Sequence, residues 1–404
     1  MKPVDVSSLK LGTVCTKPIY FNEDQVALQA FQPITEQFLN MLKARNLQIL
    51  YSDGALVEQE IFSAATGGDT KEKEEASELY QRLKKSFQGF SSLIEFLESS
   101  EKTVESAFQA SAAGKNLPAM NLQNLATEII KKTANQPEMH ILIFHPEQEA
   151  SQASHSVSVA ILCATTAHHL NFSEEATEDL VLAALLQYVG LANNPVYLQK
   201  KGQKLTAEEK AVLHKHPVQA YQSIKKSLPG KERVAQLVLS SQEHFDGSGF
   251  PQQKGGDAIP QHAMVLHIID SYVAMTEAKS YRAARLPNEA MKELINSAGF
   301  EYQPLLVKAF LSRFSMYPLG SYVELSNGQF GFVLGFHKEK PLRPAVVITR
   351  DSDKKQMEKL RLVNLFYRTG LYIVKGLQPK ELNTTFQKEF EYLLLRLESI
   401  NSSG

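Results

Sequence analysis

The feature that most constrains the fold of this chain is a long central stretch in which one amphipathic helical pattern follows another. From about Asn121 to Phe314, apolar residues recur at the three- and four-residue spacing of helices that bury one face. Examples are NLQNLATEIIKKTA, HSVSVAILCATTAHHL, EEATEDLVLAALLQYVGL and AMVLHIIDSYVAMTEA. Thr206 and Glu209 have the spacing of a capping box before another such run. The sequence therefore predicts an all-α helical domain at residues 121–316.

The regions on either side of this stretch have a different character. Residues 1–62 combine short strand-like runs with one helical run, ITEQFLNMLKARN, and predict a small α+β module. Residues 63–120 begin with the polar run SAATGGDTKEKEEA and continue with helical spacing, which indicates a linker and connecting helices. In residues 317–404, two strand-like runs flank Asn327-Gly328, a strong hairpin signal, and a helical run follows near the end. We expect a small β-barrel-like domain with a terminal helix there, within a multidomain and mainly α protein.

Composition excludes some classes of function and sets the expected compartment. The 404 residues are 22% charged with a formal net charge of −1, so neither nucleic acid nor an acidic membrane surface is an expected partner. No apolar run approaches the roughly 20 residues of a membrane-spanning helix, and the first residues lack the apolar core of a signal peptide. Cys15 and Cys163 are far apart among apolar residues, and we expect buried free thiols. These features predict a cytoplasmic protein without a membrane span.

A glycine-rich turn between two helical runs is the first candidate site. It contains Asp246, Gly247, Gly249, Phe250 and Pro251 within QEHFDGSGFPQQKGGDAIP. The glycines permit backbone angles closed to other residues, and the proline stiffens the exit from the turn. One interpretation is a turn that only ends one helix and starts the next. The other is a surface for a ligand or a partner protein.

Five segments of the chain, in this order, resemble motifs of the HD-GYP domain, a branch of the HD phosphohydrolase superfamily. They are HSVSVA, LLQYVGL, KKGQKLTAEEKAVLHKHP, QEHFDGSGFPQQKGGDAIP and LHIIDSYVAMTEAKSYR. The two end regions also resemble segments that flank this domain in some members. The resemblance implies a helical, metal-dependent phosphodiesterase that hydrolyses the bacterial second messenger cyclic di-GMP. It also implies that the glycine-rich turn contacts partner proteins.

The metal-ligand positions of the family are only partly kept in this sequence. The resemblance places three ligands at His155, His216 and Asp270. At four further ligand positions, where the family has histidines and an aspartate, this chain has Gln187, Tyr188, Ser241 and Gln242. Neutral oxygens are poor replacements for imidazole, and a phenol with a pKa of roughly 10 is a poor replacement for a bridging carboxylate. We therefore expect no metal cofactor and no catalytic residue.

The alternative is an iron or manganese ion at the residual positions, because two histidines and one carboxylate can bind a single ferrous ion. The resemblance puts His155 and Asp270 on one metal ion and His216 on its neighbour, so such a site needs rearrangement. His267 lies three residues before Asp270 and could face the same pocket. A core or hydrogen-bonded role is the simpler interpretation of His267.

Cationic and aromatic side chains near the motifs are candidates for binding the dinucleotide itself. Lys201 (or its neighbour Lys200), Lys279 and Arg282 could contact phosphate, and Phe250 could stack on a base. The alternative for the cations is a solvated or ion-paired structural role. The sequence leaves both interpretations open.

Three hypotheses about function follow. The first is a catalytically inactive, degenerate HD-GYP protein that acts as a regulatory or interaction protein with signalling proteins as partners. The second is a sensor that binds cyclic di-GMP without cleaving it. The third is an active, metal-dependent phosphodiesterase with a reorganised site. Metal content and hydrolysis distinguish the third hypothesis from the others, and binding distinguishes the second from the first.

Overall fold

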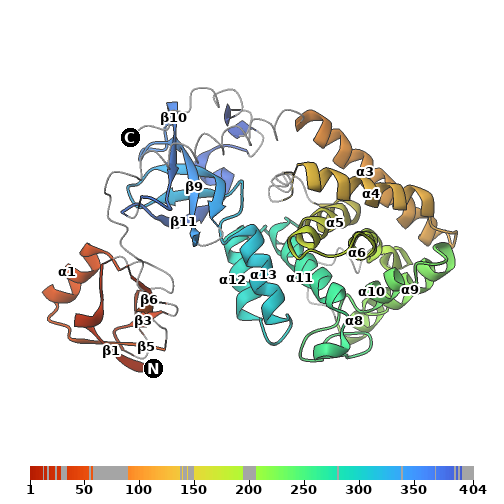
Figure 1. Cartoon of the computed structure of the whole chain (residues 1–404), viewed down its shortest axis with the longest axis horizontal. Coiled ribbons are helices and arrows are strands. Elements are labelled where there is room, and N and C mark those ends of the chain that lie inside the picture. Colours follow the sequence, from red (N-terminus) through yellow and green to blue (C-terminus); the bar gives the residue numbers. More distant parts are fainter. Residues whose placement is uncertain are drawn as a thin grey trace. The chain divides into compact units, whose positions relative to one another are not determined.

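The chain divides into two units by its internal contacts (Figure 1). One contains residues 1–74 with 365–372, and the other contains residues 75–364 with 373–404. The computed structural model describes residues 1–11, 13–15, 18–22, 25–28, 34–53, 56–57, 90–136, 139, 143, 150–193, 206–279, 282–337, 340–368, 370–385, 388–389 and 392–393. Of the predicted linker and connecting helices at residues 63–120, residues 63–89 lie outside the described residues.

The N-terminal region is the α+β module that the sequence predicts. Its four-stranded antiparallel sheet has the order β1-β5-β3-β4, formed by Lys2–Asp5, Ile49–Ser52, Ile19–Tyr20 and Val26–Leu28. A second pair joins β2 (Val14–Cys15) and β6 (Leu56–Val57). Helix α1 (Glu36–Ala44) starts at Thr35, whose side chain caps the Phe38 amide. Its Phe38 and Leu42 share a hydrophobic core with Ile19 and Leu50.

The second unit is built around helices, as predicted. In chain order they are α3 (Phe90–Ala112), α4 (Ala119–Asn135), α5 (Gln152–His169), α6 (Glu174–Leu186), η3 (Val189–Asn193), α8 (Ala207–Leu213), α9 (His216–Ser227), α10 (Glu232–Leu239), η4 (Gly256–Ala258), α11 (Gln261–Thr276), α12 (Pro287–Asn296) and α13 (Pro304–Phe314). Thr206 and Glu209 form the predicted capping box at the start of α8.

Helices α5, α6 and α11 form the centre of this helical domain (Figure 1). Each is buried on most sides because its middle is almost free of charged side chains. Ser151 caps the amide of Ser154 at the start of α5, and Ser173 caps that of Ala176 at the start of α6. A buried ionisable side chain on these helices therefore needs partners within the protein.

The C-terminal strands form an open antiparallel sheet of order β10-β9-β8-β7-β11. The strands are β7 (Tyr322–Leu325), β8 (Phe330–His337), β9 (Lys340–Arg350), β10 (Gln356–Asn364) and β11 (Ile373–Leu377), followed by η5 (Pro379–Leu382). The hairpin predicted at Asn327-Gly328 joins β7 to β8, with Gly328 at φ +80°. The barrel-like part of the prediction is not confirmed: within the described strands, β10 and β11 are the two edges of a sheet that does not close. The predicted terminal helix lies largely outside the described residues.

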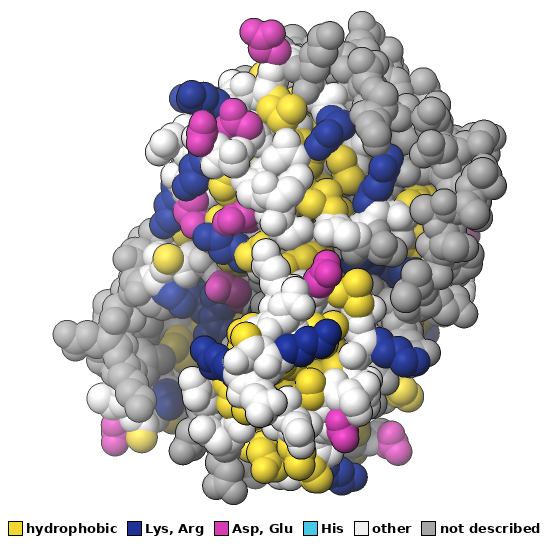
Figure 2. Space-filling model, turned by 90° about the vertical axis from the view of Figure 1, so that its left-hand side faces the viewer, with side chains coloured by type: hydrophobic (Ala, Val, Ile, Leu, Met, Phe, Trp, Pro, Cys, Tyr) yellow, Lys and Arg dark blue, Asp and Glu magenta, His cyan; other side chains and the backbone are white. Residues whose placement is uncertain are grey.

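One face of the molecule illustrates the near-neutral composition. On the face in Figure 2, lysine and arginine side chains are scattered among hydrophobic and acidic ones rather than gathered into one basic area. Cys15 and Cys163 are buried and free, as expected. Within the described part of the chain, no helix has the length and hydropathy needed to span a bilayer.

Candidate functional site

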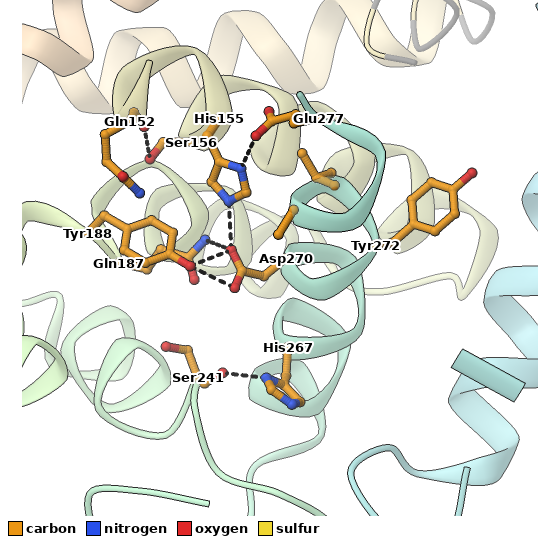
Figure 3. A network of polar contacts seen from close by, with 12 residues as sticks. Gln152, His155, Ser156, Gln187, Tyr188, Ser241, His267, Asp270, Tyr272 and Glu277 are labelled. Atoms are coloured by element: carbon orange, nitrogen blue, oxygen red, sulfur yellow. Dashed lines mark hydrogen bonds and ion pairs between the residues drawn. The ribbon is translucent and has the colours of Figure 1, made fainter. Parts of the chain in front are cut away.

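The centre of the candidate site is the buried carboxylate of Asp270, in the middle of α11 (Figure 3). Side chains from two other segments donate hydrogen bonds to it. The Tyr188 hydroxyl lies 2.8 Å from Oδ2 and 3.0 Å from Oδ1, and Gln187 Nε2 lies 3.0 Å from Oδ1. His155 Nε2, from α5, lies 2.9 Å from Oδ1. Both oxygens of Asp270 are therefore occupied by donors from the protein.

The other ring nitrogen of His155 faces a second buried carboxylate. Its Nδ1 lies 2.8 Å from Oε2 of Glu277, directly after α11. Burial lowers the pKa of His155, but the negative charge of Glu277 and the hydrogen bonds to Asp270 and Glu277 outweigh it and raise the pKa to about 9. An imidazolium with both N–H groups donating is the form that fits two carboxylates.

The same contacts shift the pKa values of Asp270 and Tyr188 in opposite directions. Burial alone would raise the pKa of Asp270, but the hydrogen bond and positive charge of His155 and the Tyr188 hydrogen bond lower it. Burial and the charge of Asp270 raise the pKa of Tyr188 well above its usual value. Tyr188 is therefore a neutral donor and Asp270 an anionic acceptor.

The four positions at which this chain lacks the family's metal ligands differ in whether their side chains contact Asp270. Gln187 and Tyr188 bond directly to Asp270, and Gln242 Nε2 makes a long contact of 3.5 Å to its Oδ2. The Ser241 hydroxyl instead donates to the Val238 carbonyl at 2.9 Å. The structure thus brings three of these four residues to Asp270, and they present hydrogen-bond donors to it.

His216 is the residual ligand position that does not bond to Asp270. Its Nδ1 donates to the Leu213 carbonyl at 2.9 Å, and its ring stacks on Tyr188 at 5.5 Å between centroids. Its Nε2 is buried and has no hydrogen-bond partner among the described residues. Burial lowers the pKa of His216 to about 4, so Nε2 carries a lone pair at neutral pH.

His267 has the hydrogen-bonded core role that the sequence favours. Its Nδ1 lies 3.1 Å from the Ser241 carbonyl, and its ring lies against Tyr302. Burial lowers the pKa of His267 to about 4. This contact links α11 to the chain just after α10 and helps to position the glycine-rich turn that follows.

The side chains present do not fit the two-metal centre that the family resemblance implies. The orphaned Nε2 of His216 is an available ligand atom, but the carboxylate of Asp270 is taken up by hydrogen bonds and the positions around it carry amides and a phenol. Among the side chains the structure describes, no group of three or more His, Cys, Asp or Glu is arranged to hold a metal ion. Whether the protein carries a cofactor stays a matter of prediction.

The predicted turn residues Asp246 to Pro251 lie together, and Glu243 holds them in place. This buried carboxylate accepts hydrogen bonds from the Gln252 amide at 2.7 Å and the Lys254 amide at 3.0 Å. Sequence reasoning missed this role, although Glu243 lies within the matched motif. Phe250 stacks on His214, with 3.8 Å between centroids and 3° between planes. No sequence signal indicated that contact, because it joins two separate segments.

The two glycines of the turn are required for different reasons. Gly247 has φ +82°, which other residues rarely adopt. At Gly249 a Cβ atom would lie 2.3 Å from the His244 amide nitrogen and 2.5 Å from the Gln242 carbonyl oxygen. The sequence prediction of special backbone angles is therefore right for Gly247, whereas the second glycine permits a close backbone approach.

We expect Gly249→Ala to destabilise the helical domain more than Gly247→Ala. The first substitution forces rigid backbone apart, at a cost of about 2–3 kcal/mol, whereas the second adds about 1 kcal/mol of backbone strain. Urea denaturation followed by circular dichroism at 222 nm measures both changes. Equal losses in the two variants would contradict the close-approach explanation.

The cationic candidates make contacts within the protein. Lys279 Nζ lies 3.2 Å from Glu277 Oε2, and Arg282 donates to the Ala274 carbonyl. The backbones of Lys279 and Arg282 also bond to each other. Lys200 and Lys201 lie outside the described residues. A phosphate contact by any of these cations stays a prediction.

Comparisons with known proteins relate this geometry to a family. Residues 136–306 match the HD domain family, and residues 322–385 match a KOW domain associated with HD domains. A cyclic di-GMP phosphodiesterase of Pseudomonas aeruginosa is 24% identical over 279 residues, 69% of this chain and 67% of that protein. A cyclic di-GMP phosphodiesterase response regulator of Xanthomonas campestris is 32% identical over 146 residues, 36% of this chain and 39% of that protein.

Two further matches are another curated relative and a solved structure. A cyclic di-GMP phosphodiesterase of Borreliella burgdorferi is 24% identical over 48% of this chain and 50% of its own length. The alignments with these three curated relatives thus span from about two fifths to two thirds of their lengths. A solved structure of an HDG"Y"P protein from Bdellovibrio bacteriovorus has a TM-score of 0.46 and 16% identity, over 76% of this chain and 97% of that one.

Proposed function

The chain belongs to the HD domain family, in its HD-GYP branch, and we therefore propose that it acts in cyclic di-GMP signalling without hydrolysing the dinucleotide. Its role in this proposal is that of a regulatory or interaction protein. The observation that carries the proposal is the buried carboxylate of Asp270, which accepts hydrogen bonds from His155, Gln187 and Tyr188. A carboxylate held in this way is not available to coordinate an ion.

The chemistry of phosphodiester hydrolysis explains why this observation matters. Bound metal ions activate water by lowering its pKa, and they neutralise charge that develops on the phosphoryl oxygens. The side chains around Asp270 supply one imidazolium, one phenol and amide groups instead. His155 already donates both protons to carboxylates, and Tyr188 is held neutral, so neither is a general base near neutral pH. We infer that water is not activated in this pocket.

A sensor that binds cyclic di-GMP is the second candidate function. It is favoured by the aromatic pair at the turn, where the exposed His214 ring stacks flat on Phe250. Flat aromatic side chains suit stacking with nucleobases, which is tolerant of base identity. If no ligand binds there, we place the contact with a signalling partner at the same turn, Asp246 to Pro251.

One experiment on the full-length protein separates the hypotheses. We expect purified protein to contain no stoichiometric iron, manganese or zinc by elemental analysis, and to yield no linear dinucleotide from cyclic di-GMP by chromatography. An active relative, such as the Pseudomonas enzyme, is the positive control. Calorimetric titration with cyclic di-GMP on the same sample then tests the sensor: heat of binding without product supports it, and its absence favours an interaction protein. Linear product from metal-loaded wild-type protein would overturn the proposed function.

A further inference from the structure

The segment that follows α11 folds back onto the end of that helix. The chain leaves the helix at Glu277, which has extended backbone angles, so the last carbonyls of α11 have no donor within the helix. The Ala274 carbonyl accepts a hydrogen bond from the Arg282 guanidinium, and the Met275 carbonyl accepts one from the Arg285 amide at 3.0 Å. A cation at this end also faces the negative pole of the helix dipole. Arg282 is therefore a side-chain cap of α11.

Lys279 and Arg282 are held together beside this helix end. Their backbones exchange two hydrogen bonds, of 2.9 Å and 3.0 Å. Lys279 Nζ lies 3.2 Å from Glu277 Oε2 and 3.4 Å from the Ala150 carbonyl oxygen. The Nε atom of Arg282 is buried and has no partner among the described residues. These contacts direct both cations toward the end of α11, and we call the pair Lys279 and Arg282 the clasp.

Glu277 is the residue through which the clasp reaches the candidate site. Its side chain is 3% exposed, and its Oε2 atom lies 2.8 Å from His155 Nδ1 as well as 3.2 Å from Lys279 Nζ. Figure 3 shows Glu277 on the side of His155 that faces away from Asp270. Because Glu277 directly follows the last turn of α11, unwinding of that turn moves its carboxylate. The position of Glu277 therefore depends on the cap that Arg282 provides.

We propose that Arg282 is a positioning residue: it closes the end of α11 and, with Lys279, holds Glu277 against His155, and neither cation binds phosphate. The clasp is a conformational device that keeps the far side of His155 occupied by a carboxylate. In the alternative, in which these cations bind the phosphates of cyclic di-GMP, donors now directed at Glu277 and at the helix end have to turn away. The inference goes beyond the proposed function and does not depend on whether the dinucleotide is hydrolysed.

The test is nuclear magnetic resonance of full-length protein with isotope-labelled histidine nitrogens, comparing wild type with Arg282→Ala near neutral pH. His155 carries two reporters, because its Nδ1 proton is donated to Glu277 and its Nε2 proton to Asp270. We expect both signals in wild type, since protons in buried hydrogen bonds exchange slowly with water. In Arg282→Ala the Nδ1 signal should be lost to exchange while the Nε2 signal stays. Amides in the last turn of α11 should exchange about tenfold faster, as measured by mass spectrometry.

Arg285→Ala is the matched control. Its guanidinium belongs to the same segment, but it pairs with Glu293 at the surface and donates to no carbonyl of α11 in the described structure. Both His155 signals should persist in this variant. Arg282→Lys keeps a cation at the helix end and should restore part of the Nδ1 signal.

Three results would overturn the proposal. Loss of both His155 signals in Arg282→Ala would show a general loosening of the pocket, and retention of both would show that Arg282 does not hold Glu277. Loss of the wild-type Nδ1 signal on addition of excess cyclic di-GMP would show that the clasp turns to phosphate, whereas we expect the signal to remain.

A second variant covers the case in which Arg282→Ala does not fold. Lys279→Met keeps the aliphatic stem and removes the amine from Glu277, so it should weaken the Nδ1 signal of His155 and leave the Nε2 signal unchanged. An unchanged Nδ1 signal would contradict the role of the clasp. Hydrolysis of cyclic di-GMP by wild-type protein would refute the proposed function and leave this inference standing.

Discussion

Replacing Asp270 with alanine is expected to lower the free energy of unfolding by about 3–5 kcal/mol, the range for removing one partner of a buried ion pair. The substitution leaves the His155 imidazolium with Glu277 alone, and it removes the acceptor of Gln187 and Tyr188 in the protein interior. Urea denaturation monitored by circular dichroism at 222 nm measures the loss. Asp270→Asn should lose less, because its amide oxygen still accepts the Tyr188 hydroxyl.

This experiment also distinguishes a hydrogen-bonded network from a metal site that has lost its ion. In an ion-free ligand cluster a carboxylate is commonly an unsatisfied, repelled charge, so its removal stabilises the protein. A gain in stability for Asp270→Ala would therefore contradict the network described here. Asp246→Ala is the matched control, because Asp246 is exposed and only bonds locally to the Ser248 amide. We expect little change in that variant.

The stability of the helical domain is expected to peak near pH 6.5 and to fall on both sides. His216 and His267 have pKa values lowered to about 4 by burial, against about 6.5 when unfolded. Below pH 6.5 the unfolded chain therefore binds more protons than the folded chain, and stability is lost as the pH falls toward 4. His155 has a pKa raised to about 9, so its contribution is complete below pH 6.5 and is lost as the pH rises through 9.

The two sides of this profile should have different slopes. Each proton contributes about 1.4 kcal/mol per pH unit, so the acid side, with two histidines, should be about twice as steep as the alkaline side. Urea midpoints between pH 5 and pH 9 provide the measurement. His267→Asn, which can still donate to the Ser241 carbonyl, should remove about half of the acid slope and leave the alkaline side unchanged. Constant stability between pH 5 and pH 6.5 would show that the buried histidines do not titrate as described.

Much of the fold follows from local sequence patterns. Helical periodicity predicted the central domain, the spacing of Thr206 and Glu209 predicted a capping box, and Asn327-Gly328 predicted a hairpin, all of which the structure confirms. These features depend on residues close together in the chain. Closure of a barrel depends on whether the first and last strands meet, which strand patterns do not specify. The open sheet therefore could not be predicted from them.

The amino-acid sequence by itself determined which chemical groups stand at the candidate site: it placed amides, a hydroxyl and a phenol where ligands were expected and kept His155, His216 and Asp270. Only the tertiary structure decided what these groups do. The packing of α5, α6 and α11 directs donors toward Asp270 and brings Glu277 to the far side of His155. The physical reason is that a buried charge needs partners within the protein. Here those partners come from segments far apart in the chain, and only the packing of the helices brings these segments together.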